Sequence, residues 1–413
     1  MHNKQRRGMS IFQDARNIGN NRGDRVFTIL KGGNVFAPPD LGIKDVVIAG
    51  RQISNIAPDI SPDWQYGETQ VVDVTDMSVV PGFIDQHVHL LGGGGEDGFA
   101  TRTPEVVLTD ITQAGTTTVV GCLGTDGITR HMAGLLAKAR SLDEEGVTTY
   151  LYTGAYEVPP PTLTGNVRTD LVLIDKIIGC GEVAISDHRS SQPSKEELAR
   201  LAAEARVGGL LSGKAGILHL HVGAGPRQLN VLFELIAETE IPISQFVPTH
   251  INRNWELILE GIKLANKGGV IDFTAADPAD QGNETITAAQ AILFCLKQGV
   301  PIEQLTISSD GHGSLPVFDG NGGVSGIKES KLTCLYEEVK QLVLAGLSLG
   351  EAIKPVTINP ARVLKLTPTK GTMAIGSDAD IVVIDKLLNI RHVFAKGRWL
   401  VRDGQAIVKG TFE

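Results

Sequence analysis

The sequence has few features that would connect it with a membrane or an oxidising compartment. Only four cysteines occur in 413 residues, and none of them form a Cys-x-x-Cys pair. A disulfide framework is therefore not expected, and a reducing compartment is favoured. No run approaches the ~18 apolar residues of a membrane span, and the basic N-terminus lacks the apolar region of a secretory signal. We expect a cytoplasmic protein.

An excess of positive charge is also lacking. Lysine and arginine number 38 against 47 aspartates and glutamates, so the formal net charge is −9 at pH 7. An acidic chain without a stripe of basic residues binds nucleic acid and anionic membrane surfaces poorly. We therefore expect neither of these as a partner.

Glycine, in contrast, is abundant. It accounts for 48 of the 413 residues, where ~7 % is usual. The glycines follow no collagen period and are not part of a low-complexity region, which excludes a fibrous or disordered chain. Such an excess is typical of many tight turns, or of backbone that lies close to a ligand.

Eight β-rich runs recur through the middle of the chain about every 32 residues, close to the length of a βαβ unit. They are 83–89, 116–121, 148–153, 182–186, 216–221, 245–250, 269–274 and 305–310. Segments with helical spacing lie between them, such as 105–113, 131–142, 195–205, 255–265 and 286–296. This alternation predicts an α/β protein with a (β/α)8 TIM-like barrel.

The two ends of the chain are also rich in short β segments. These are 46–48 and 53–56 near the beginning and 379–384, 392–394 and 399–401 near the end. We expect both ends to form one small β-sandwich domain from residues 26–80 and 373–413, with the barrel over 81–372. Residues 1–25 are polar and lack periodicity, so they are expected to be a mobile tail.

Side chains that ligate metals lie at the carboxyl ends of the predicted strands, where such barrels carry their chemistry. His87 and His89 close the first strand and share one of its faces, so both imidazoles enter the same space. Further ligand types lie at the ends of strands five, six and eight and within strand four: His221, His250, Asp310 and Glu182. Imidazole and carboxylate without thiolate suit zinc. Four histidines and an aspartate exceed the ligands of one catalytic zinc, so we expect two divalent ions, with Zn²⁺ as the expected metal, bridged by one carboxylate.

The other histidines are expected to have supporting roles. His219 shares the face of His221 but lies deeper, so we interpret it as a packed histidine or one that supports a ligand. Asp187 is likewise expected to support the site rather than to bind a metal. The remaining histidines are expected at the surface or in support: His131, His188, His312 and His392.

Two motifs of other protein classes are explained by their context. Residues 93–98 satisfy the dinucleotide pattern G-x-G-x-x-G, but no helix is predicted directly after them, as that fingerprint requires. Residues 346–350 satisfy G-x-S-x-G, but they follow a helix, and Ser348 with Glu351 forms a capping box for the next helix. Neither a dinucleotide site nor a serine hydrolase is expected.

The expected metal pair indicates hydrolysis of an amide or an ester, because two metals can activate a bridging hydroxide and polarise a carbonyl. Asp310 is placed to act as the general base. Arg189 and Arg253 follow strands four and six, and their guanidinium groups can recognise carboxylates. Glu96, in the loop after the histidine pair, can hold an ammonium group. These charges favour a small zwitterionic substrate, such as a peptide or an N-acyl amino acid.

Residues 81–90, Pro-Gly-Phe-Ile-Asp-Gln-His-Val-His-Leu, followed by four glycines and Glu96, resemble the isoaspartyl dipeptidase family of the amidohydrolase superfamily. The resemblance continues through 101–106, 124–126, 153–156, 185–190, 248–254, 308–311 and 408–413. It implies removal of an L-aspartyl residue that is joined through its side-chain carboxyl group. It also implies a homo-oligomer, an octamer in this family.

The resemblance assigns roles to individual residues. The implied metal ligands are His87, His89, His221, His250 and Asp310, the last of which is also the general base. The implied substrate contacts are Gly94, Gly95, Glu96, Thr125, Tyr156, Arg189, Arg253 and Ser314. Tyr156 would lie near the scissile carbonyl, where a phenol can stabilise the oxyanion.

One position departs from the better-known members of this family. They bridge their metals with a carbamylated lysine, whereas this sequence has Glu182 at the matching position. Both groups end in a carboxylate, but glutamate is shorter, so its strand must approach the metals. Gly179 and Gly181 can permit a bulge that does this. We hypothesise that Glu182 bridges the metals directly and that assembly needs no CO₂.

Two alternatives to a β-aspartyl dipeptidase stay open. A related amidohydrolase of the dihydroorotase, hydantoinase or N-acyl-amino-acid deacylase type would use the same ligands. A non-catalytic barrel that acts as an oligomeric scaffold is the other alternative, but it predicts lost ligands, and all five His/Asp positions are intact.

Overall fold

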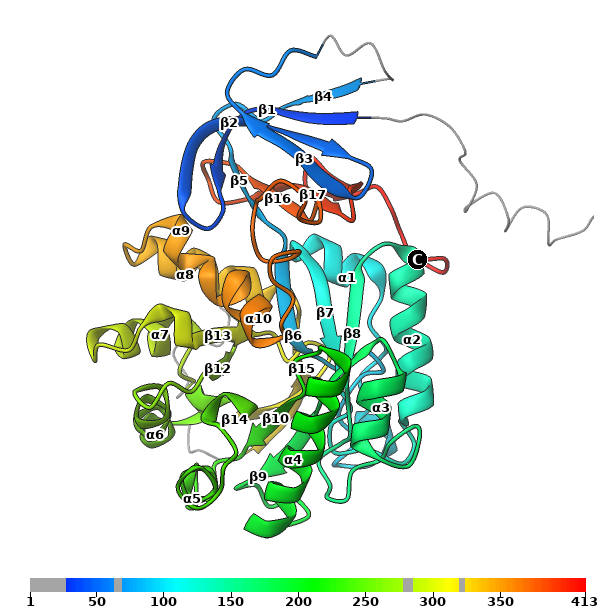
Figure 1. The fold of residues 1–413 in the computed structure, drawn as a ribbon, viewed down its shortest axis with the longest axis vertical. Helices are drawn as coiled ribbons and strands as arrows, with labels where there is room; N and C mark the ends of the chain where they lie inside the picture. The colour runs from blue at the N-terminus through cyan, green and yellow to red at the C-terminus, as the bar shows by residue number, and fades with distance from the viewer. Residues whose placement is uncertain (1–26, 63–68, 278–284, 319–323) are drawn as a thin grey trace, which may run out of the picture.

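The computed structural model describes residues 27–62, 69–277, 285–318 and 324–413. The tail predicted over 1–25 lies outside the described residues. None of the helices in these ranges has both the length and the apolar character needed to cross a bilayer. Figure 1 shows two parts, a barrel surrounded by helices and a β-sheet domain that lies against one end of it.

All eight strands predicted for the barrel are present. They are β6 (Phe83–Val88), β7 (Thr116–Gly121), β8 (Thr148–Thr153), β9 (Ile177–Ile185), β10 (Ile217–Val222), β11 (Phe246–Thr249), β12 (Ile271–Thr274) and β13 (Leu305–Ser308). The largest difference from the prediction is in β9, which begins five residues before the expected Glu182. Its first residues are Ile-Ile-Gly-Cys-Gly, and this segment, which we did not include in the strand, is fully buried.

The barrel strands are parallel and follow the order of the sequence. β6 to β11 form one six-stranded sheet, and β12 and β13 form a separate pair. The ring closes between β13 and β6, where the backbone N–H of His89 donates to the carbonyl of Gly311 at 2.9 Å and Val88 forms a parallel bridge with Gly311. This confirms the TIM-like barrel, with all strand carboxyl ends at one rim.

Helices cover the outside of the barrel (Figure 1). They are α1 (Leu108–Gln113), α2 (Met132–Glu145), α3 (Val167–Leu173), α4 (Lys195–Ser212), α5 (Asn230–Glu238), α6 (Trp255–Ala265), α7 (Ala288–Lys297), α8 (Cys334–Leu344), α9 (Leu349–Ala352) and α10 (Ile358–Val363). Short 3-10 turns are η2 (Phe99–Thr101), η3 (Ile243–Gln245), η4 (Ile251–Arg253), η6 (Ile302–Gln304) and η7 (Lys354–Val356).

Helix α4 begins at a clear sequence signal but is longer than predicted. It begins with a capping box, in which Ser194 and Glu197 bond reciprocally to each other's backbone N–H. We expected it to end near residue 205, but it continues to Ser212. Gly208 lies so close to α3 that a Cβ there would come within 2.8 Å of the Cβ of Leu171. Gly208 therefore lets α3 and α4 approach each other and does not end α4.

Strands from both chain ends form the second part. They are β1 (Phe27–Phe36), β2 (Asp40–Ala49), β3 (Gln52–Ala57), β4 (Thr69–Asp73), β5 (Ser78–Pro81), β16 (Ile381–Ile384), β17 (Ile390–Ala395), β18 (Arg398–Arg402) and β19 (Gln405–Ala406). They join in one sheet because β5 pairs antiparallel with β16. Leu30, Val46, Ile381 and Phe394 share its core, so residues from the two chain ends pack together, as predicted. The domain boundaries themselves stay a prediction.

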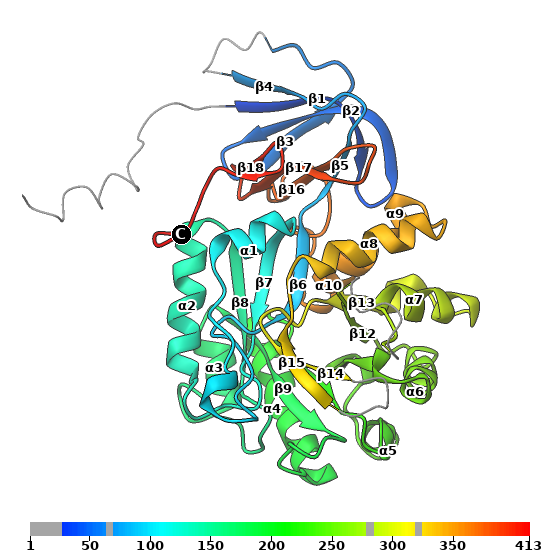
Figure 2. The same cartoon turned by 180° about the vertical axis from the view of Figure 1, so that it is seen from behind.

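Figure 2 shows the molecule from behind, with the C-terminus beside α2. A hairpin that we did not predict, β14 (Ser314–Phe318) with β15 (Val324–Glu329), follows the last barrel strand.

The two glycine motifs that resemble those of other protein classes have the local structure that we expected. Gly98 is followed by the 3-10 turn η2 and not by an α-helix, and Ser348 caps α9 by accepting from the N–H of Glu351.

Candidate metal centre and substrate pocket

The first histidine pair lies at the end of β6, fully inside the barrel rim. Nε2 of His87 and Nε2 of His89 each lie 3.4 Å from Oε1 of Glu182. The same two nitrogens lie 3.3 and 3.0 Å from Oδ1 of Asp310, which follows β13. Four predicted ligands from three strands therefore converge on one small volume.

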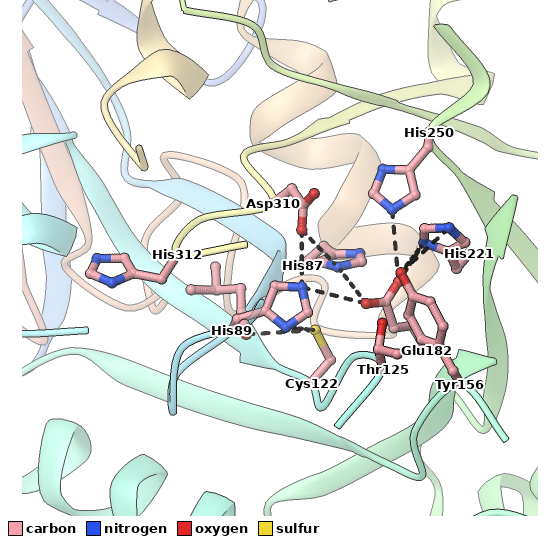
Figure 3. A network of polar contacts seen from close by, with 12 residues as sticks. His87, His89, Cys122, Thr125, Tyr156, Glu182, His221, His250, Asp310 and His312 are labelled. Atoms are coloured by element: carbon pink, nitrogen blue, oxygen red, sulfur yellow. Dashed lines mark hydrogen bonds and ion pairs between the residues drawn. The ribbon is translucent and has the colours of Figure 1, made fainter. Parts of the chain in front are cut away.

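The second pair faces the other oxygen of the same carboxylate. Oε2 of Glu182 lies 3.3 Å from Nδ1 of His221 and 3.7 Å from Nε2 of His250. Figure 3 shows the Glu182 side chain between the two histidine pairs. One buried carboxylate with an oxygen toward each pair is the arrangement that a metal-bridging ligand requires.

A β-bulge brings Glu182 to this position. Along β9, Cys180 pairs with Leu218 and Val183 pairs with Leu220, so β9 has one more residue than β10 over this step. Gly181 lies in the bulge, and a Cβ there would come within 2.7 Å of the carbonyl oxygen of His219. Only glycine fits this close approach. The predicted bulge is therefore confirmed, and the lack of a side chain at Gly181 explains why it can form.

Two ligands have unusual backbone conformations. His250 has φ 66° and Asp310 has φ 54°, both in the left-handed region that residues with a Cβ seldom adopt. His250 follows β11 directly, and Asp310 comes two residues after the end of β13. Such conformations gather at functional sites, where the surrounding structure holds them.

The donor set fits divalent cations. The two carboxylate oxygens of Glu182 and Nε2 of His87 are buried and, among the described residues, have no hydrogen-bond partner. Burial opposes a negative charge on Glu182, but the surrounding histidines outweigh it and hold the pKa of this carboxyl well below its usual range. The buried carboxylate is thus ionised, as a metal ligand must be.

The potential ligand atoms form three overlapping sets, and within each set all atoms lie within 4.8 Å of one another. The sets are His87, His89, Cys122 and Glu182; His87, His250 and Asp310; and Glu182, His221 and His250. No thiol was expected at this site. Cys122 follows the last residue of β7, and its Sγ lies 4.0 Å from Nδ1 of His89. Its position at the end of a predicted barrel strand is the sequence signal that could have identified it as a potential ligand.

The ligand histidines are oriented by the residues we expected to support them. Nε2 of His219 lies 2.8 Å from Nδ1 of His87, which leaves Nε2 of His87 for the metal side. Burial lowers the pKa of His219 well below its usual value, so this ring is neutral. Oδ2 of Asp187 lies 2.9 Å from Nε2 of His221, which turns Nδ1 of that ring toward Glu182.

The remaining histidines lie apart from the ligands. His131 caps α2 by accepting from the N–H of Gly134, and His188 is exposed at the pocket. His392 and His312 are buried. The ring of His312 lies 3.2 Å from Asp110 and 2.9 Å from Glu329, and thus connects α1 with the β14–β15 hairpin.

A cavity of about 670 Å³ opens beside the metal ligands. Seven of the eight expected substrate contacts line it, namely Gly94, Glu96, Thr125, Tyr156, Arg189, Arg253 and Ser314. Gly95 is not one of the residues that line the cavity, and its contact with the substrate stays a prediction. The lining residues that were not predicted include Asp126, Arg130, Leu315 and Ile327. The last two belong to the unpredicted hairpin, so no signal for them was available in the sequence.

The charged groups of the pocket are partly paired with one another. Arg189 donates to Asp187 at 2.8 Å and to Glu96 at 3.2 Å, and Thr125 donates to the same oxygen of Glu96 at 3.0 Å. Burial opposes the charge on Arg189, but Asp187 outweighs it and raises the pKa of this guanidinium. Arg253 donates its Nε to the carbonyl of Val222 at 2.7 Å, and its Nη2 lies 3.3 Å from Nε2 of His221 at the wall of the cavity.

Tyr156 places a phenol beside the second histidine pair. Its Oη lies 2.7 Å from Nδ1 of His221, the nitrogen that also faces Glu182. Burial, assisted by the negative charge of Glu182, raises the pKa of Tyr156 well above its usual value. The phenol therefore keeps its proton and can donate a hydrogen bond to an oxyanion.

A parallel eight-stranded barrel whose rim carries four histidines, a buried glutamate and an aspartate defines a class of metal-dependent hydrolases. The pattern of the amidohydrolase family matches residues 78–400 of this chain. A β-aspartyl dipeptidase from Fervidobacterium islandicum AW-1, solved with β-Asp-Leu, is 45 % identical, has a TM-score of 0.85 and covers 92 % of this chain and 98 % of its own. The chain belongs to the amidohydrolase family and, within it, to the β-aspartyl dipeptidases.

Other relatives are more distant or match only a segment. The dihydroorotase of Acetivibrio thermocellus is 23 % identical, over 86 % of this chain and 89 % of its own. Adenine deaminase 2 of Jannaschia sp. (strain CCS1) is 45 % identical over 76 residues, which is 18 % of this chain and 12 % of that protein. The chain thus spans only about an eighth of the length of this deaminase.

Proposed function

We propose that this protein is a metal-dependent β-aspartyl dipeptidase, which hydrolyses the amide between the side-chain carboxyl of an N-terminal aspartate and the next residue. One observation carries the proposal. A buried carboxylate, Glu182, lies between two histidine pairs, beside a pocket that is lined by both acidic and basic side chains. The similarity to the dipeptidase solved with β-Asp-Leu supports this choice of substrate.

The metal centre would use the ligands brought together at the rim. His87, His89 and Asp310 would hold one divalent ion, His221 and His250 would hold another, and Glu182 would be shared by both. We propose Zn²⁺ for both positions, since borderline divalent ions suit imidazole and carboxylate donors. Two such ions supply activation of a water molecule and polarisation of the scissile carbonyl.

The protein's own groups would then move the protons. Asp310 would accept a proton from the attacking water and return it to the leaving amine. Its Oδ1 lies within 3.3 Å of both His87 and His89, so the carboxylate is held at the rim in a fixed position. Tyr156 would donate a hydrogen bond to the oxyanion that forms at the carbonyl.

The pocket would bind the two ends of the dipeptide. We propose that Glu96 receives the α-ammonium group, and that Arg189 and Arg253 receive the carboxylates. The remaining predicted contacts would come from Gly94, Gly95, Thr125 and Ser314. In the structure Glu96 already contacts Arg189 and Thr125, so an incoming ammonium group would replace a contact within the protein.

The proposal is tested by assaying the zinc-loaded protein on β-Asp-Leu, α-Asp-Leu, dihydroorotate and a hydantoin. We expect kcat/KM for β-Asp-Leu to exceed that for α-Asp-Leu at least about a hundredfold, because the scissile bond of the α-peptide would be displaced from the metals. A chelator should abolish the activity and Zn²⁺ should restore it. Preferential hydrolysis of a cyclic amide would contradict the proposal and favour a dihydroorotase or hydantoinase.

We further propose a cytoplasmic homo-oligomer, an octamer by the resemblance to the family. The four cysteines are all buried and free of disulfides, which fits a reducing compartment. Light scattering of the purified protein would give the number of subunits, and a monomer would contradict this proposal.

A further inference from the structure

Strand β12 provides none of the expected metal ligands, yet it carries a carboxylate in the barrel interior. Asp272 is fully buried, and four side chains donate to it. Oδ1 accepts from Nε2 of Gln86 at 2.7 Å and from Oγ1 of Thr306 at 2.7 Å. Oδ2 accepts from Oγ1 of Thr249 at 2.6 Å and from Oγ of Ser308 at 2.5 Å. A buried carboxylate with this many donors is a strong local constraint.

The donors of Asp272 lie next to metal ligands in the chain. Gln86 on β6 directly precedes His87, and Thr249 on β11 directly precedes His250. The third, Ser308 on β13, comes two residues before Asp310. His87, His250 and Asp310 are also one of the three potential ligand sets, with all their ligand atoms within 4.8 Å of one another. A single carboxylate thus connects the strands that carry a complete set.

Backbone pairing is weakest where Asp272 acts. Among the described residues, β11 and β12 belong to different sheets, and β13 and β6 share only an isolated bridge at Val88 and Gly311. The bond from Thr249 crosses the first gap. The bond from Gln86 crosses the second gap, and Gln86 also donates to Thr306 at 2.8 Å. Side-chain hydrogen bonds thus cross both gaps in place of ladder bonds, and Asp272 is the carboxylate that accepts across each of them. Asn252 and Thr274 add further bonds between the segment after β11 and β12.

We infer that Asp272 is a positioning residue, which holds His87, His250 and Asp310 in metal-binding geometry across these two gaps. The inference rests on the proposed metal centre, but it concerns a residue that is neither one of the proposed ligands nor one of the proposed substrate contacts. Groups of this kind that support ligands typically contribute tenfold to a hundredfold to metal affinity.

The test measures Zn²⁺ affinity of the metal-free full chain by competition with a chromophoric chelator. We expect Asp272→Ala to bind the weaker Zn²⁺ about 10- to 100-fold less tightly and to lose kcat, while KM for β-Asp-Leu changes less than about twofold because the pocket charges are untouched. Asp272→Asn should recover the affinity to within about threefold of the wild type, since its oxygen still accepts and its amide can donate to the hydroxyls of Thr249 and Ser308.

Glu338→Ala is the matched control. Glu338 is also a buried carboxylate, and it accepts from the N–H groups of Ala276, Ala288 and Ala289 at 2.9, 3.2 and 2.7 Å. Its donors adjoin no metal ligand. We expect this variant to lose thermal stability but to bind Zn²⁺ as the wild type does.

Two single-donor variants serve if Asp272→Ala does not fold. Thr249→Val and Ser308→Ala each remove one hydroxyl next to a ligand-bearing segment, and each should weaken Zn²⁺ binding about two- to tenfold. The inference is overturned if a folded Asp272→Ala, or both single variants, bind Zn²⁺ like the wild type. Failure of the proposed function would be seen separately, as a wild-type protein that binds zinc tightly but does not cleave β-Asp-Leu.

Discussion

The two parts of the barrel hold their ligands by different means. From β6 to β11 the strands form one continuous parallel sheet, and here His221 and the bulged Glu182 are placed by the backbone ladder. The strand pair β12–β13 is joined to its neighbours largely by side chains, among them Asp272 and Asn252. Where a strand is paired on both sides, its backbone hydrogen bonds can therefore hold its ligand in position. Where pairing is interrupted, a buried polar side chain from another strand holds the ligand instead.

The largest effect is expected from Glu182→Gln, which alters the proposed bridging ligand in the continuous sheet from β6 to β11. The variant keeps the shape but removes the charge shared by both histidine pairs, so both ions should be lost and kcat should fall by at least about 10⁴-fold. Metal content by mass spectrometry, together with kcat, checks this. Retention of two ions per chain would mean that Glu182 is not the bridge.

Asp310→Asn makes the corresponding change beside the β12–β13 pair. We expect kcat to fall about 10³-fold because the proton acceptor is removed, while the site formed by His221, His250 and Glu182 still binds one ion. Measurement of kcat and metal content on the same sample separates these effects. Loss of both ions would show that the two parts of the barrel do not act separately.

Tyr156→Phe tests the role of the phenol without altering a ligand. Removing one oxyanion donor should lower kcat about a hundredfold with little change in KM. Tyr336→Phe is the control, because the hydroxyl of Tyr336 donates to the carbonyl of Leu388, away from the pocket. A rise in KM with unchanged kcat would assign Tyr156 to binding only.

Gly181→Ala tests whether the bulge places Glu182. The added Cβ would meet the carbonyl of His219 at 2.7 Å, so we expect a loss of about 1–3 kcal/mol in stability and about tenfold weaker Zn²⁺ binding. Gly213→Ala also introduces a side chain at positive φ, but nothing lies within 4 Å of its Cβ. It should cost stability without changing zinc affinity, and the same zinc loss in both variants would refute the explanation by close approach.

The smallest effect is expected from Cys122→Ala. Histidine and carboxylate donors suffice for both proposed ions, so zinc affinity should stay within about threefold of the wild type. Cobalt-substituted protein offers a second readout, since a thiolate ligand gives a charge-transfer band that imidazole does not. Such a band, lost in Cys122→Ala, would add a thiolate to the expected ligand set.

The sequence predicted the barrel and the ligand set because both depend on local patterns. Each barrel strand is a run of apolar or β-branched residues, and the strand ends of a parallel barrel meet at one rim. The prediction failed where glycine has a packing role, as in the start of β9 and the end of α4. There the glycines allow close approach to a neighbour, which sequence spacing does not reveal.

Partners contributed by distant strands were beyond the prediction. Asp272 lies in an otherwise ordinary buried strand, and its importance follows only from four donors that are between 23 and 186 residues away. The hairpin β14–β15 was missed for a similar reason, since its place at the pocket depends on the turn of the chain after Asp310. A ligand can be recognised from its place at the end of a strand. A residue that holds a ligand through hydrogen bonds from distant strands cannot be recognised from the sequence around it.

Whether Glu182 itself bridges two metal ions can be measured by reconstituting the metal-free protein with Zn²⁺ in CO₂-free buffer and counting the bound ions. We expect two ions per chain and full activity on β-Asp-Leu, with no change on adding bicarbonate. A single bound ion, or metal loading that depends on bicarbonate, would contradict it.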